Sequence, residues 1–113
     1  MGTNPNEFLP LAPATLHILL ALSDQDRHGY GIMQEVRAQS DGRYRLGPGT
    51  LYDNLSKLLN QGLIEETGRK SSEDARRRYY RLTSNGREVA ALEIKRLESM
   101  FRKAKPHLKE GTV

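Results

Sequence analysis

The sequence predicts a mainly α-helical protein with one small β-hairpin, and three segments support that prediction. The segment between Pro48 and Gly62 places its leucines on a single helical face: Leu51, Leu55, Leu58 and Leu59. Residues 63–67 and 78–82 read as two strands around a charged turn, and residues 83–105 as a longer amphipathic helix. A small helix with polar groups on its outer face, followed by a basic hairpin, is the arrangement of a winged helix-turn-helix. DNA is therefore the first partner to consider.

Composition limits the classes of protein that the chain can belong to. Its 113 residues fit one domain, and a hydrophobic share of only 36% with no Trp favours stabilisation by oligomerisation. The absence of Cys excludes disulfides, thiol catalysis and Cys-ligated zinc. No apolar run reaches the roughly 20 residues that cross a bilayer, and the N-terminus lacks the features of a signal peptide. We expect a soluble cytoplasmic protein with no membrane partner.

The net charge of +4 is unevenly distributed along the chain. Residues 1–42 hold two basic and five acidic side chains, whereas residues 43–81 hold nine basic and five acidic ones. The remaining residues add seven basic and four acidic side chains. Basic charge therefore gathers over the small leucine helix, the hairpin and the last helix, as expected for a surface that faces phosphates. A solvated basic face of an ordinary soluble protein would have the same composition.

The elements before the leucine helix follow from local signals. Residues 1–11 form a flexible arm in which Phe8, Leu9 and Leu11 are candidate anchors. A first, largely buried helix runs over residues 13–22, starting at a proline, and a polar turn covers residues 23–28. The second helix covers residues 29–39. Residues 43–46 form either a short strand or an extended link.

The third helix and the hairpin have equally clear boundaries. Pro48 suits the first helical turn, with Gly47 as a weak N-cap, and Gly62 stops the helix. Residues 68–75 contain no large apolar side chain to hold them down, so we expect a mobile tip. Tyr79 and Tyr80 supply the packing groups of the returning strand.

The last helix carries the spacing of a coiled-coil seam. Thr83 or Ser84 caps its start, and it ends before Pro106 because proline breaks the hydrogen-bond ladder. Its apolar residues alternate by four and three: Ala90, Ile94, Leu97, Phe101 and Ala104. We expect this seam to join two copies of the chain. The alternative is that the helix folds back on its own domain.

No group of residues has the pattern of a catalytic or metal site. His17, His28 and His107 lack metal-ligand spacing, and no Cys could complete such a site. His17 is expected to be a packed histidine, and His28 a helix cap or a phosphate contact. Residues 47–50 have neither Walker nor GxGxxG spacing. We expect no enzymatic activity, no metal and no cofactor.

Three motifs in order resemble the PadR family of winged-helix transcriptional regulators, specifically its short members with one C-terminal helix. They are HGYGIMQEV at 28–36, GPGTLYDNLSKLLNQGLI at 47–64 and RRRYYRLTSNGRE at 76–88. The middle motif is the most specific, because few winged helices place GTLY before the leucine stripe. The resemblance covers about residues 12–105. Many family members have Ser where Gly47 stands, so the start of the third helix is expected to be less rigid here.

The resemblance implies which residues touch DNA. The third helix would enter the major groove with Pro48, Gly49, Thr50, Tyr52, Asn54 and Lys57. Tyr52 matches a tyrosine that contacts phosphate in the family, although it could instead cap the core, and Lys57 could be an ordinary solvated lysine. The wing would contribute from Arg69, Lys70, Arg76, Arg77 and Arg78. Because alternate strand residues face opposite ways, we favour Arg76 and Arg78 among the last three.

We therefore expect a homodimeric repressor that binds a pseudo-palindromic site in double-stranded DNA. The resemblance also implies a small hydrophobic or aromatic effector held between the dimer helices, with five candidate pocket residues: Phe8, Leu16, Leu97, Met100 and Phe101. These side chains could equally just fill the interface. The alternative function is a winged-helix module that binds protein without specific DNA readout. The expected parts are an arm (1–11), a DNA-binding domain (12–82), a dimerisation helix (83–105) and a tail (106–113).

Overall fold

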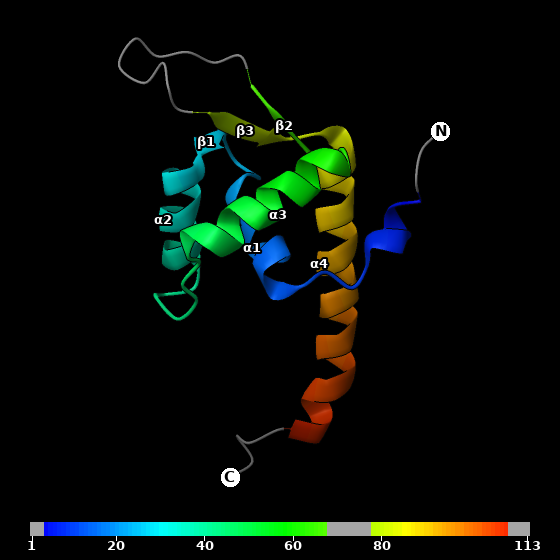
Figure 1. Cartoon of the computed structure of the whole chain (residues 1–113). Helices are drawn as coiled ribbons and strands as arrows, with labels where there is room; N and C mark the ends of the chain where they lie inside the picture. The colour runs from blue at the N-terminus through cyan, green and yellow to red at the C-terminus, as the bar shows by residue number, and fades with distance from the viewer. Residues whose placement is uncertain (1–3, 68–77, 109–113) are drawn as a thin grey trace.

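The computed structural model describes residues 4–67 and 78–108. Its elements follow one another as η1 (Pro5–Phe8), α1 (Pro13–Ala21), β1 (Arg27–His28), α2 (Gly29–Gln39), α3 (Pro48–Asn60), β2 (Ile64–Glu66), β3 (Tyr79–Leu82), α4 (Ser84–Ala104) and η2 (Lys105–Leu108). In Figure 1 the first three α-helices gather beneath the small sheet, and α4 passes beside them and continues beyond the rest of the molecule. This arrangement confirms the predicted fold class, a winged helix-turn-helix with a long C-terminal helix.

Local chemistry sets the helix boundaries, as the sequence predicts. The Thr83 hydroxyl accepts a hydrogen bond from the Gly86 N–H at 3.0 Å and caps α4. His28 caps α2 in the same way, with Nδ1 accepting from the Gly31 N–H at 3.0 Å. Beyond the end of α3, Gly62 has a φ of 73°, a left-handed conformation that glycine adopts without strain.

The sheet has three strands where the sequence predicts two. Its order is β1-β3-β2, antiparallel throughout, with Glu65 opposite Arg81 and Arg27 opposite Tyr80. The extra strand, β1, lies in the segment predicted to be a polar turn. Two polar residues cannot show the alternation that marks a strand, so only the partner strand reveals it. Residues 43–46 form an extended link, not a strand.

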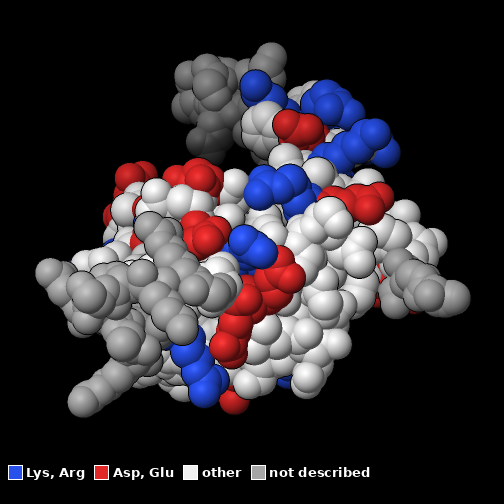
Figure 2. Space-filling model, turned by 90° about the horizontal axis from the view of Figure 1, so that it is seen from above, with Lys and Arg blue, Asp and Glu red and all other residues white. Residues whose placement is uncertain are grey.

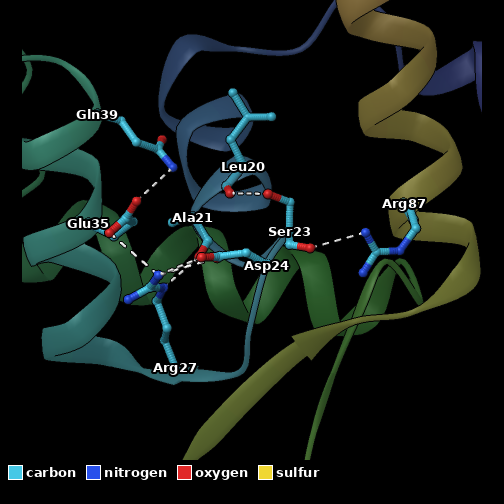
Figure 3. Close-up of polar contacts among 8 residues, drawn as sticks. All are labelled: Leu20, Ala21, Ser23, Asp24, Arg27, Glu35, Gln39 and Arg87. Atoms are coloured by element: carbon cyan, nitrogen blue, oxygen red, sulfur yellow. Dashed lines mark hydrogen bonds and ion pairs between the residues drawn. The ribbon is translucent and has the colours of Figure 1, made fainter.

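Arg27 of the short strand β1 is held by contacts with α1 and α2. Its Nε donates a hydrogen bond to the Ala21 carbonyl at 2.7 Å, and its Nη2 lies 3.4 Å from Oε1 of Glu35 on α2 (Figure 3). The turn after α1 is also held, because Arg87 of α4 donates a hydrogen bond to the Ser23 carbonyl at 3.1 Å (Figure 3). These contacts satisfy the end of α1 and join it to α2 and α4.

The core lies where the three first helices, the sheet and the first half of α4 meet. It is formed by Ile18, Leu19, Ala21, Leu22, Ile32, Val36, Leu46, Leu51, Leu55, Leu58, Leu63, Ile64, Tyr80, Leu82, Val89 and Ala90. Gly86 allows α4 to pack closely against this core. A Cβ at Gly86 would overlap the Leu63 carbonyl oxygen, so only glycine allows the helix to approach so closely.

The segment before α1 packs along α4. The sequence predicts a flexible arm over residues 1–11, whereas in the structure η1 contacts α4 and the residues after it reach α1 (Figure 1). Phe8, Leu9 and Leu11 are partly buried against the core, which places the three candidate anchors in apolar surroundings. The Leu11 N–H also donates to Oε2 of Glu93 on α4 at 2.9 Å. Apolar contacts and this hydrogen bond together hold the segment in place.

Candidate nucleic-acid interface

The third helix, α3, turns its leucine face inward and leaves its polar face exposed. Leu51, Leu55 and Leu58 are at most 1% exposed, as their spacing predicts. Asp53 and Ser56 are exposed on the opposite face. The helical period places both of them away from the leucines, although neither is among the contact residues predicted from the sequence. This face is the part of α3 that can enter a groove of DNA.

The first turn of α3 is open to an incoming anion. Gly47 is the N-cap and supplies no side-chain cap, and Pro48 follows it at the first helical position. A Cβ built at Gly47 or at Gly49 meets nothing within 4 Å, so the space around this turn is free. N–H groups of a first helical turn have no intrahelical acceptor and carry the positive end of the helix dipole. The start of α3 is therefore suited to a phosphate group.

Tyr52 lies across the start of α2, where Gly29 makes room for it. A Cβ at Gly29 would overlap the Tyr52 hydroxyl oxygen and lie 3.0 Å from the ring carbon Cζ. The side chain is nevertheless 51% exposed. Its ring therefore packs between two helices while part of it faces solvent. This position suits a hydroxyl that donates to a phosphate, as the family resemblance implies.

The wing, residues 64–82, meets α3 close to Tyr52. Burial raises the pKa of the Tyr80 hydroxyl, and the Glu66 carboxylate raises it further, whereas the nearby Arg78 guanidinium lowers it. The Tyr52 hydroxyl is near enough to act on the same group. Tyr80 is thus a neutral hydrogen-bonding group at pH 7. Tyr80 of β3 and Tyr52 of α3 thus lie near each other.

Asn54 and Lys57 lie on the side of α3 that faces α1. The Thr15 hydroxyl donates to Oδ1 of Asn54 at 2.7 Å, and Nδ2 of Asn54 donates to the Thr50 carbonyl at 2.9 Å. Both ends of this amide are occupied, so Asn54 braces α1 against α3 instead of pointing freely outward. Lys57 is exposed and forms no ion pair with any residue that the structure describes.

Of the predicted wing contacts, Arg78 is described, and Arg69, Lys70, Arg76 and Arg77 lie outside the described residues. Arg78 is 72% exposed and lies 3.5 Å from Glu66. Arg81, on β3, pairs with Glu65 of β2 at 2.8 Å. Figure 2 shows basic and acidic side chains next to each other on the face seen from above. Each of the two carboxylates of β2 is therefore offset by an arginine on β3 or just before it, which the charge count along the sequence did not reveal.

The predicted seam on α4 divides into a covered part and an open part. Ala90 is only 6% exposed and belongs to the intrachain core, because the first half of α4 packs on its own domain. Ile94 and Leu97 are half-buried, Ala104 is exposed and Phe101 is 60% exposed. Among the described residues, the exposed large hydrophobic side chains also include Met100 and Leu108. The end of α4 thus presents apolar surface that this chain does not cover.

Two of the five candidate pocket residues line separate cavities in the described part of the chain. Phe8 lines a cavity of about 310 Å³ beside α3, together with Lys57. Met100 lines another of about 460 Å³ between Leu9 and α4. Leu16, Leu97 and Phe101 line neither of these two.

Glu93 is a buried charge on α4 that sequence reasoning missed. It is 1% exposed, and Oε2 accepts hydrogen bonds from the Leu11 N–H and from Nη2 of Arg96, each at 2.9 Å. The bonds from Arg96 lower the pKa of the Glu93 carboxyl, and the Leu11 N–H adds to that effect, while burial opposes it. A glutamate between apolar helix positions was the available signal. Arg96 lies only three residues away, but the second partner, Leu11, lies 82 residues away in the sequence.

The buried, hydrogen-bonded Glu93 carboxylate predicts that the folded state loses stability in acid. Since the folded-state pKa of Glu93 lies below its unfolded value of about 4.3, its contribution to stability is complete above that pH and is lost as the pH falls further. Replacing Glu93 with Gln should lower the unfolding free energy at pH 7 by about 1 to 3 kcal/mol. Urea titrations at pH 7 and pH 3.5 should show wild type losing more stability on acidification than Glu93→Gln. Equal losses would contradict this role.

The sequence also predicts that His17 is a packed histidine. His17 stacks on Tyr44, with ring centroids 4.4 Å apart, which confirms a packed histidine.

None of the helices in the described part of the chain has the length and apolar character of a membrane-spanning segment.

These elements define the class of the protein: a winged helix-turn-helix, in which an exposed helix and a β-hairpin form one face for DNA. Residues 18–92 match the family described as transcriptional regulator PadR-like. The chain belongs to this family of DNA-binding transcriptional regulators. The motifs at 28–36, 47–64 and 76–88 all lie within the matched region.

Individual relatives agree with this family. Over 91 residues the chain is 36% identical to the transcriptional regulator Rv3488 of Mycobacterium tuberculosis, covering 80% of this chain and 81% of that protein. A transcriptional regulator from Clostridium thermocellum has a TM-score of 0.71 at 26% identity, covering 84% of this chain and 92% of that one. Bacillus subtilis PadR, solved in complex with operator DNA, has a TM-score of 0.62 at 21% identity, over 73% of this chain and 46% of that one. At this identity the last likeness concerns the fold alone.

Proposed function

We propose that this chain is a homodimeric repressor that binds a pseudo-palindromic operator. The observation that carries the proposal is the open first turn of α3 beside the half-exposed Tyr52, on a chain of the PadR-like family. The exposed face of α3 would enter the major groove, and its first turn would contact the backbone. The wing would lie along the flanking DNA. Occupation of a promoter by such a protein would block transcription.

The uncovered end of α4 supports a dimer. Leu97 and Phe101 lie one helical turn apart on the seam, and Met100 widens the apolar strip. Pairing two such helices about a two-fold axis would cover these side chains and place two copies of α3 on the same side of the assembly. Half-sites would then be about 10 base pairs apart, or one turn of DNA.

The groove on α4 supports an effector. It has a volume of about 460 Å³ and combines the apolar side chains of Leu9, Leu92 and Met100 with the cations of Lys95 and Lys103. A small hydrophobic or aromatic molecule fits both the size and the lining. Bound beside the seam, it would change how the two α4 helices pack and thereby the spacing of the two α3 helices.

The proposal is tested by fluorescence anisotropy with duplex fragments from upstream of the protein's own gene, against scrambled DNA as competitor at near-physiological salt. We expect binding of at least one fragment that survives the competitor, with two chains per duplex. Affinity should fall steeply with added salt, because phosphate neutralisation releases counterions. Equal affinity for every fragment and for scrambled DNA would argue against specific readout and for the protein-interaction alternative.

Tyr52 provides a residue-level prediction. Removing its hydroxyl with Tyr52→Phe should weaken operator binding by about tenfold, the range for one hydrogen bond to a charged group, and leave the unfolding midpoint nearly unchanged. Gly29→Ala should have a similar effect on binding, because its new Cβ overlaps the hydroxyl and forces the ring aside. Unaltered affinity in both variants would assign Tyr52 to packing alone.

A further inference from the structure

A basic cleft lies along α2, next to the start of α3. It has a volume of about 240 Å³ and is lined by Tyr30, Met33, Gln34, Arg37, Arg45 and Leu46. The four α2 residues follow one another at helical spacing, so they share one face of the helix. On this face Met33 packs against the core, whereas the other three side chains are exposed. The other two belong to the extended link before α3. No predicted DNA contact lies in this cleft.

The two arginines of the cleft have no carboxylate partner within the described part of the chain. Ion pairs between described residues engage Arg27, Arg78, Arg81 and Arg96, but neither Arg37 nor Arg45. Both side chains are exposed. Glu35, the one acid on α2, is held on another face by Arg27. Two uncompensated guanidinium groups on one small concave surface produce a local positive potential.

The cleft is also continuous with the proposed DNA-binding face. Leu46, at its edge, directly precedes Gly47, the N-cap of α3. Tyr30, at the other edge, is 59% exposed and directly follows Gly29, over which Tyr52 lies. The start of α3 and the Tyr52 hydroxyl therefore flank the cleft along one surface. A DNA strand that contacts the first turn of α3 would run past it.

We infer that this cleft binds the phosphate backbone of the DNA strand that would flank α3 in the complex. Arg37 and Arg45 would pair with phosphate oxygens, for which the planar guanidinium is well suited, and the Tyr30 hydroxyl would donate a further hydrogen bond. The contact would be independent of base sequence and would fix the position of α3 in the groove. This inference rests on the proposed function, since it assigns part of the same interface.

The test compares Arg37→Gln plus Arg45→Gln with Arg102→Glu, which changes the charge by the same amount at the exposed far end of α4. Binding to operator and scrambled duplexes is measured between 50 and 300 mM salt, and thermal unfolding confirms that each variant folds. A dimer of the cleft variant lacks four of the cleft cations, each of which contributes about 0.9 to the salt slope. We therefore expect the slope to fall by about 3 to 4 and the affinity for both duplexes to fall about tenfold or more, in equal proportion. The control variant should retain most of the wild-type slope.

An unchanged slope and affinity in the cleft variant, with wild type still preferring its operator, would overturn this inference and leave the proposed function standing. A loss of operator preference with unchanged binding to scrambled DNA would also overturn it, because it would indicate a base contact. Wild-type protein that binds no duplex would overturn both.

Discussion

Replacing Leu97 and Phe101 with Asp is expected to convert the protein into a folded monomer and to weaken operator binding by about 100-fold or more. Phe101 is 60% exposed and Leu97 only half-buried, so the single chain tolerates the change. A dimer would have to bury four new carboxylates in an apolar seam, which is strongly unfavourable. The second half-site contact would then no longer be intramolecular, and the avidity that it adds would be lost.

Sedimentation velocity gives the oligomeric state, and anisotropy with the operator duplex gives the affinity. Ala91→Asp plus Arg102→Gln is the matched control, since it changes the charge of α4 by the same amount at exposed positions off the seam. The control should remain dimeric and bind operator to within a few fold of wild type. A dimer that persists in Leu97→Asp plus Phe101→Asp would show that the chains associate through another surface.

Replacing Gly86 with Ala is expected to lower the unfolding free energy by about 3 kcal/mol, a large share of the stability of a domain of this size. The new Cβ would overlap the Leu63 carbonyl oxygen, which is backbone and cannot rotate away. That carbonyl also accepts a hydrogen bond from the Thr83 N–H at 3.1 Å. Relief of the overlap therefore requires α4 to move off the core.

Gly49→Ala is the control for that measurement, because Gly49 also lies in a first helical turn. A Cβ there meets nothing within 4 Å, so alanine should be neutral or stabilise the fold by up to about 1 kcal/mol. Urea unfolding of both variants at pH 7 makes the comparison. A Gly86→Ala variant no less stable than Gly49→Ala would contradict the close contact between α4 and the start of β2.

Local signals predicted most of the helical framework. The prolines that begin α1 and α3, the Thr83 cap and the left-handed Gly62 act within a few residues of their position, so they can be recognised without knowing the fold. The leucine period likewise determined which face of α3 is buried. The position of α3 and the face that it buries were therefore predictable from the sequence.

Features that depend on distant contacts were not predictable in this way. The strand β1 exists only because β3 pairs with it, and Asn54 is occupied only because the fold brings Thr15 beside it. Glu93 is buried against a backbone N–H that lies 82 residues away in the chain. Ala90 fitted the heptad pattern, but that pattern does not say which part of a helix its own domain covers.

Sequence-specific recognition can be measured by selecting binding sites from a random pool of duplex DNA and then titrating the enriched duplex. We expect an enriched motif with two-fold symmetry, half-sites about 10 base pairs apart and two chains bound per duplex. A pool that stays random after repeated rounds, while the folded protein binds all duplexes equally, would contradict sequence-specific recognition.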